Sequence, residues 1–244
     1  DITDNRGIHL FPQSYSADKW KTAADALKTA IDVAHEAGHD LFDFKQTNYA
    51  SKLNEKTILA MQVRGAATER WNKEIIWGHP IFMGGQGTGG LRKCYAPPLR
   101  IVEQFYTENG VPIEEDKDWV GIDPMGIKTA SASDKLYIQE GFETINLHFK
   151  REARFYGSII FDGGTFYGNS RTTTDNNLWV TKLKFGNISG GNTPTDRHSS
   201  TGYLCKKMIH YLSSVPDNSD QFTQHRYAFP IIRLADLYLM YAEA

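Results

Sequence analysis

The chain has 244 residues, of which 40% are apolar and 23% are charged, and its formal net charge is −2. This composition is typical of a folded globular protein and excludes a disordered one. The near-neutral charge provides no basic stripe that could displace counterions from phosphates, which argues against a nucleic-acid partner and against binding to a membrane surface through a polybasic patch. No run approaches the roughly 20 apolar residues that span a bilayer.

Residues 17–37 carry the clearest helical pattern in the first half of the chain. Apolar and small side chains recur on one face, namely Trp20, Ala23, Ala24, Leu27, Ala30, Ile31 and Ala34. Ser16 suits the N-cap and Gly38 suits the end of this helix. A weaker pattern at residues 51–68 predicts a second helix, which we expect to pack against the small residues of the first as a helical hairpin. The full tetratricopeptide repeat signature is not present.

The middle of the chain predicts shorter elements. Residues 74–77 indicate a short strand, and residues 98–108 indicate an amphipathic helix. Between them, the five glycines of residues 84–90 predict a flexible or tightly turning loop. This loop lacks the Lys and Ser/Thr that end a phosphate-binding loop, so a nucleotide site is not expected. Residues 112–132 are acidic and then small and polar, which suggests a surface excursion.

Residues 142–149 and 158–161 predict ordered apolar segments, and residues 165–201 form the longest irregular region, rich in Gly, Asn, Thr and Ser. Four aromatic residues interrupt this polar stretch, namely Phe166, Tyr167, Trp179 and Phe185. Sugars are bound by rings that stack on their C–H faces and by planar polar groups that bond their hydroxyls. The irregular region contains both kinds of side chain.

A candidate sugar platform therefore lies within residues 166–179. Its candidate residues are Tyr167, Trp179, Asn169, Arg171 and Asn177, with Asp175 and Asn176 beside them. Trp119, in the acidic excursion, is a second candidate ring. The alternative is that these aromatic side chains pack against the core and hold their loops in place, because large aromatics are usually mostly buried.

The last eighteen residues, 227–244, read YAFPIIRLADLYLMYAEA and predict a helix with Pro230 in its first turn. Apolar residues occupy nearly its whole circumference, so we expect burial on several sides. No terminator follows Ala244, and we expect the natural chain to continue. An isolated chain of 244 residues is expected to be poorly soluble, because the cut helix would expose apolar surface. Residues 1–244 are expected to form a single domain that is incomplete at the C-terminus and also at the N-terminus.

Four segments, taken in order, resemble the SusD/RagB family. They are residues 96–113 (APPLRIVEQFYTENGVPI), 151–168 (REARFYGSIIFDGGTFYG), 201–211 (TGYLCKKMIHY) and 227–244. The resemblance implies a mainly α fold, in which a tetratricopeptide-like helical scaffold carries long irregular loops and a few short strands.

The resemblance also implies a function. SusD-like proteins are outer-membrane lipoproteins of the cell surface that capture an oligosaccharide and pass it to a SusC-like TonB-dependent transporter. The lipid anchor would belong to an N-terminal segment that this chain lacks. Two alternatives remain open: a RagB-type protein that takes up peptide, and a helical scaffold that binds other proteins and has no small-molecule site.

Three charged residues are expected to form an internal ion network. Arg233 and Asp236 lie three positions apart on the C-terminal helix, where their side chains can pair, and Arg154 precedes Phe155 and Tyr156. Buried charges need partners, so a structural role in fixing helix packing is favoured over catalysis.

We predict no enzymatic activity. A glycosidase needs two carboxylates flanking the scissile bond. The available carboxylates lie on polar segments and are Glu114, Glu115, Asp116, Glu140, Glu143 and Asp162. The motifs of serine hydrolases and zinc proteases do not occur in a supporting context. No cofactor or metal is predicted, although a calcium ion in an Asp/Asn loop is left open. Cys94 and Cys205 are interpreted as free thiols, since their spacing matches neither a metal site nor a disulfide framework.

Overall fold

The computed structural model describes residues 2–11, 14–80, 96–169, 171–187, 199–214 and 223–244. The predicted glycine loop at residues 84–90, Cys94 and part of the irregular region lie outside the described residues. The fold is mostly helical with short strands, as the sequence predicted. Two compact units make up the chain: unit 1 is Asp1–Leu41, Lys73–Trp77 and Ile231–Ala244, and unit 2 is Phe42–Asn72 and Gly78–Pro230.

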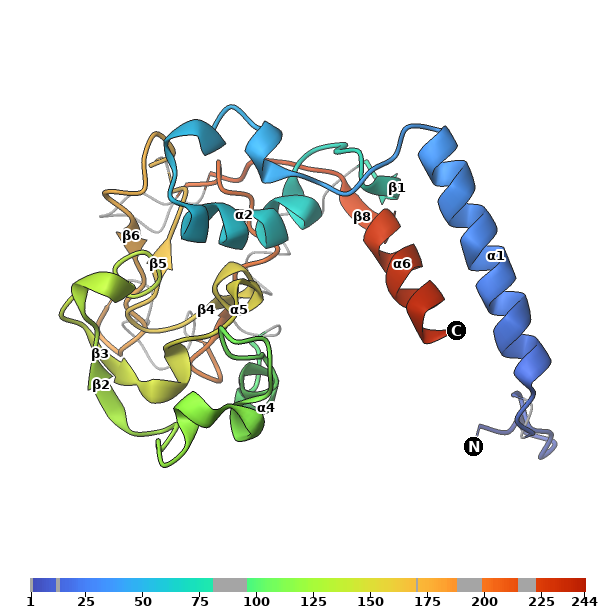
Figure 1. Ribbon diagram of the computed structural model, residues 1–244, viewed down its shortest axis with the longest axis horizontal. Helices are drawn as coiled ribbons and strands as arrows, with labels where there is room; N and C mark the ends of the chain where they lie inside the picture. The colour runs from blue at the N-terminus through green and yellow to red at the C-terminus, as the bar shows by residue number, and fades with distance from the viewer. Residues whose placement is uncertain (1, 12–13, 81–95, 170, 188–198, 215–222) are drawn as a thin grey trace. The chain divides into compact units, whose positions relative to one another are not determined.

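Unit 1 is built on two helices, α1 (Ala17–Glu36) and α6 (Leu234–Glu243), which lie side by side (Figure 1). Their shared core contains Ile31, Ala34, Leu234 and Leu237. The helix predicted at residues 17–37 is confirmed. Its partner was predicted wrongly, because α6, from the other end of the chain, covers the small-residue face that we had assigned to residues 51–68.

The start of the C-terminal helix also differs from the prediction. Residues Phe229–Arg233 form a strand, β8, which pairs with β1 (Ile75–His79), and the helix begins only at Leu234. Pro230 therefore lies in extended backbone. Two consecutive β-branched residues follow it, and such residues favour a strand when a partner strand is available. The strand predicted at residues 74–77 is that partner.

A smaller part of the surface of α6 is buried than its apolar composition suggested. Leu234 and Leu237 are buried, whereas Leu239 is 70% exposed and Met240 is 44% exposed. The expectation of burial on several sides is not met in this structure, because α1 covers only one face of α6.

Unit 2 is organised around α2 (Glu55–Thr68), which packs on the short helix α5 (Ala153–Ser158). Asn54 caps α2 by accepting a hydrogen bond from the N–H of Lys56 at 3.1 Å. The contact between the two helices is close. A Cβ atom added to Gly157 would lie 2.6 Å from the carbonyl oxygen of Ala60, so only a glycine fits at this crossing.

Short antiparallel strand pairs complete unit 2. They are β2 (Ile127–Thr129) with β3 (Glu143–Ile145), β4 (Ile159–Ile160) with β7 (Leu204–Cys205), and β5 (Thr165–Phe166) with β6 (Trp179–Val180). Helix α4 (Leu99–Glu103) is shorter than the predicted helix at residues 98–108. Single 3₁₀ turns occupy Phe44–Gln46, Ala50–Lys52, Ile113–Glu115, Lys117–Trp119, Ala132–Asp134 and Asn146–His148.

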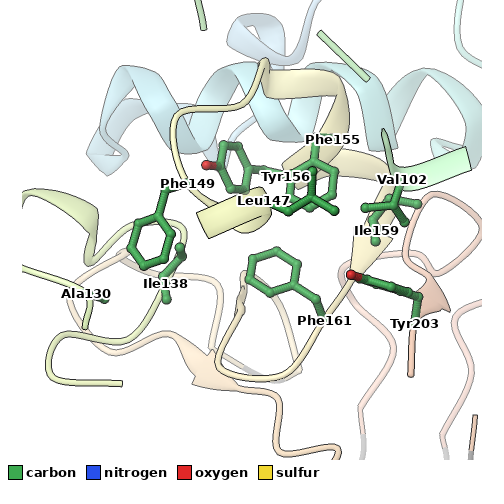
Figure 2. Close-up of a cluster of buried hydrophobic side chains, with 10 residues drawn as sticks. All are labelled: Val102, Ala130, Ile138, Leu147, Phe149, Phe155, Tyr156, Ile159, Phe161 and Tyr203. Carbon is green, nitrogen blue, oxygen red and sulfur yellow. The ribbon is translucent and has the colours of Figure 1, made fainter. Parts of the chain in front are cut away.

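The main core of unit 2 is a cluster of ten buried side chains, drawn in Figure 2: Val102, Ala130, Ile138, Leu147, Phe149, Phe155, Tyr156, Ile159, Phe161 and Tyr203. The rings of Phe155 and Phe161 stack with their centroids 5.3 Å apart. A second cluster joins Phe44 and Met61 to Tyr167 and Tyr211. Among the described residues, no helix has both the length and the apolar character needed to cross a membrane.

Candidate functional site

The candidate sugar-binding stretch folds as a strand pair closed by a long loop. Strands β5 and β6 place Thr165 opposite Val180 and Phe166 opposite Trp179. The rings of Phe166 and Trp179 meet edge to face with centroids 6.1 Å apart. Phe166 is buried and Trp179 is half-buried, so the pair anchors the base of the loop and leaves part of the indole accessible.

The first half of the loop is held by hydrogen bonds within the loop and by a close approach to Tyr211. Tyr167 donates its hydroxyl proton to the carbonyl oxygen of Thr172 at 2.7 Å, and the N–H of Arg171 donates to the carbonyl oxygen of Gly168 at 2.9 Å. Gly168 has φ +109°, and a Cβ there would lie 2.3 Å from the carbonyl oxygen of Tyr211. This turn therefore needs a glycine.

The second half of the loop is tied to the first turn of α2. The Asp175 carboxylate accepts hydrogen bonds from the N–H of Asn54 at 2.7 Å and from the hydroxyl of Thr57 at 2.8 Å. A negative group is favoured at a helix N-terminus, where backbone N–H groups are not yet bonded within the helix. Asp175 therefore acts as a structural anchor for the loop, a role that the sequence did not reveal.

The remaining polar candidates lie on the surface of this anchored loop. Asn176 and Asn177 are exposed, and Asn169 and Arg171 are half-buried. Asn169 has φ +52°, in the left-handed region that asparagine tolerates better than most residues. The loop therefore brings four planar polar side chains and the partly accessible Trp179 onto one short segment.

Two of the predicted platform rings are buried. Tyr167 is 5% exposed within the second core cluster, and burial raises the pKa of its hydroxyl to about 12. Trp119 is 7% exposed at the end of a 3₁₀ turn. Neither ring presents an open face for stacking, so we remove both from the proposed platform. Their packing follows the alternative interpretation, because burial of a large ring stabilises the core more than exposure to water.

Two buried cations lie near the loop, and sequence reasoning missed both. Arg64 of α2 is 1% exposed and donates to the carbonyl oxygens of Tyr167 at 2.6 Å and Ile209 at 2.7 Å. Lys206 is 7% exposed and donates to the carbonyl oxygens of Tyr156 at 2.8 Å and Thr165 at 2.9 Å. An arginine within an apolar helical stretch was the available signal for Arg64; the sequence offered none for Lys206.

Arg233, a residue of the predicted ion network, has two acidic partners. Arg233 lies 3.5 Å from the Asp236 carboxylate, and its backbone N–H donates to the same side chain at 3.1 Å. The stronger partner is Glu74, 2.9 Å from the Arg233 guanidinium and 3% exposed in its side chain, which the sequence did not reveal. Helix spacing could indicate Asp236 but not a residue distant in the sequence.

Arg154 is not part of a buried network. Its side chain is 62% exposed and pairs with Glu152 at 2.6 Å. The buried arginine of this segment is Arg151, which is 2% exposed and donates to the carbonyl oxygens of Leu147 at 2.8 Å and Val102 at 3.0 Å. Burial lowers the pKa of Arg151 to about 10. The prediction chose the wrong arginine of the motif, because both stand beside apolar residues and only the tertiary packing distinguishes them.

Metal-ligating side chains and the described cysteine are the remaining candidates for a site. Within the described residues, no group of three or more His, Cys, Asp or Glu side chains is arranged to hold a metal ion. Cys205 is a half-buried free thiol whose pKa is raised by burial. A raised pKa keeps the thiol protonated and less reactive, which agrees with its interpretation as a packed side chain.

Comparisons with known proteins identify the family and two related structures. The model of the SusD family matches residues 48–244. Two solved structures, BT4246 and its selenomethionine form, are each 25% identical to the chain, with TM-scores of 0.66 and 0.67. Each alignment covers 97% of this chain, but only 43% and 44% of those proteins, so the chain spans less than half of their length. A search of curated proteins finds no match.

Members of the SusD family are non-catalytic, nutrient-binding proteins of the cell surface. The family model extends over far more than half of these 244 residues and includes α2, the anchored loop, β8 and α6. The chain therefore belongs to the SusD family.

Proposed function

We propose that the protein captures a glycan at the cell surface and passes it to a SusC-like TonB-dependent transporter of the outer membrane. In this proposal the 244 residues are part of one SusD-like domain, and a lipid at a segment outside this chain holds the protein on the membrane. Membership of the SusD family is the observation that carries the proposal.

Within the described residues, the loop at residues 166–179 is the proposed contact with sugar. The accessible part of Trp179 would stack on the apolar face of one sugar ring, while the side chains of Asn169, Arg171 and Asn177 would bond hydroxyl groups. The anchoring of this loop by Asp175 supports the proposal. A surface that is ordered before binding loses less conformational entropy when the ligand arrives.

Affinity electrophoresis against a panel of polysaccharides tests this proposal on the full-length protein. One glycan class should retard the natural protein, and Trp179→Ala should weaken the retardation about tenfold, which corresponds to ~1.4 kcal/mol. Asn177→Ala should have a smaller effect. Trp77→Ala is the matched control, because Trp77 is 60% exposed on β1 and lies outside the loop.

The other outcomes separate the alternatives. Undiminished retardation of a folded Trp179→Ala variant would place the glycan site elsewhere in the protein. If no glycan retards the protein and mixing with a peptide pool releases heat, the protein would be assigned to the peptide-binding members of the family. Failure of both ligands would leave the helical scaffold as the remaining interpretation. Co-purification with the outer-membrane transporter tests the transfer step independently of the ligand.

A further inference from the structure

A small cavity lies between α2, α5 and the strands that carry the loop. Its volume is about 20 Å³, and its lining includes Arg64, Lys206, Thr165 and Gly157. Three further lining residues, Leu136, Tyr137 and Leu178, are half-buried. The cavity belongs entirely to unit 2.

Both cations of the cavity keep hydrogen-bond donors that no group of the described residues accepts. Arg64 donates hydrogen bonds through Nε and Nη1 to carbonyl oxygens. Its buried Nη2 has no hydrogen-bond partner within the described part of the chain. Lys206 has three N–H donors, and carbonyl oxygens take two of them. A buried donor without an acceptor is costly, so these groups need an acceptor inside the cavity.

Carboxylates that could compensate the two charges are also missing from the described part of the chain. Among the described residues, no carboxylate lies within ion-pair distance of Arg64 or Lys206. The Phe166 ring partly offsets the charges, since its centroid lies 4.0 Å from the Arg64 guanidinium carbon and 5.7 Å from Lys206 Nζ. One aromatic ring cannot balance two buried cations.

We propose that this cavity binds a single monatomic anion of the size of chloride, held between Arg64 Nη2 and Lys206 Nζ. A water molecule could accept one of the free N–H bonds, but it would leave both charges uncompensated. The free space, about 20 Å³, suits a small monatomic anion.

The titration behaviour of the two groups supports this assignment. Burial, followed by the nearby charge of Arg64, lowers the pKa of Lys206 to about 7. Burial also lowers the pKa of Arg64 to about 9. Both pKa values are lowered because burying a charged group costs free energy when no anion is nearby. A bound anion removes part of that free-energy cost.

Thermal unfolding of the full-length protein at constant ionic strength tests the proposal, with sodium gluconate replaced stepwise by sodium chloride. Gluconate cannot enter the cavity, so only chloride should raise the Tm. Because a ligand that binds the folded state stabilises it by mass action, each tenfold increase above the Kd should raise the Tm by about 1–3 °C. Sodium bromide should reproduce the effect.

Lys206→Met should abolish the chloride-dependent rise, whereas the matched control Lys182→Met, at an exposed lysine of the same unit, should retain it. Equal Tm values in gluconate and chloride would overturn the proposal.

Crystals of the natural protein grown in bromide give a second measurement that does not depend on the stability of a variant. An anomalous peak bonded to Arg64 and Lys206 is expected, whereas a water molecule or empty density there would refute the site.

Discussion

Arg233 donates to the Glu74 carboxylate across 2.9 Å, although 159 positions separate the two residues in the sequence. The backbone carbonyl of Glu74 also accepts the N–H of Leu234 at 2.8 Å. One residue at the start of β1 thus bonds both the last residue of β8 and the first residue of α6. The change from strand to helix at this point is therefore fixed by a tertiary contact.

Arg233→Met should destabilise the protein by about 3 kcal/mol, because it removes the guanidinium that pairs with the buried Glu74 carboxylate. Urea unfolding of the full-length protein measures the loss. The double variant Glu74→Gln/Arg233→Met should recover much of it, since an uncharged amide is easier to bury than a carboxylate. Equal losses in the single and double variants would show that the ion pair itself has no structural importance.

Arg151→Lys should cost roughly 2–4 kcal/mol, because a lysine cannot donate to the several carbonyl oxygens that the guanidinium serves together. Arg154→Lys is a matched control three positions away. Its exposed pair with Glu152 should contribute less than about 1 kcal/mol. Chemical denaturation of both variants makes the comparison, and similar midpoints for the two would contradict the assigned roles.

Gly157→Ala should destabilise the protein by about 1–3 kcal/mol, since the new methyl group would press on the Ala60 carbonyl oxygen and on Val63. Helix propensity predicts the opposite sign, a gain of up to about 1 kcal/mol. Ser158→Ala, next in the same helix, serves as the control for propensity. A raised unfolding midpoint for Gly157→Ala would mean that α2 and α5 have room to separate.

His148 should make stability fall in mild acid. Its ring nitrogens contact the Thr144 hydroxyl at 2.7 Å and the Tyr203 hydroxyl at 3.0 Å, and burial, followed by the charge of Arg151, lowers its pKa to about 3. The folded state therefore resists protonation. The contribution is complete above about pH 6.5 and is lost progressively as the pH falls towards 3.

Between pH 7.5 and pH 5 this one group should remove about 2 kcal/mol from the free energy of unfolding. His148→Gln should flatten that part of the pH profile, whereas the exposed control His9→Gln should leave its slope unchanged. Urea titrations at several pH values provide the measurement. An unaltered profile for a folded His148→Gln variant would assign the acid sensitivity to other groups.

Local patterns predicted much of this fold. Side-chain periodicity and capping, which the nearby sequence contains, predicted three elements. They are the helices at residues 17–37 and 51–68 and the strand at residues 74–77. The four segments that resemble the SusD/RagB family, taken in their order along the chain, were also sufficient to indicate the family.

The candidate site was less accessible to sequence reasoning. The loop at residues 166–179 stood out because aromatic side chains flank a polar stretch with several amides, but the sequence could not distinguish the buried Tyr167 from the partly accessible Trp179. Tertiary packing decides that difference, because Tyr167 lies within the second core cluster whereas Trp179 meets the Phe166 ring edge to face at the base of the loop.

By itself the sequence determined the family, most helix positions and the composition of the loop, since each depends on neighbouring residues. The tertiary structure alone decided that α6 packs on α1, that Glu74 receives Arg233, and that Arg64 and Lys206 share a cavity without a carboxylate. The physical reason is that burial and charge pairing are set by groups brought together from distant parts of the chain, and one sequence carries no direct record of those distances.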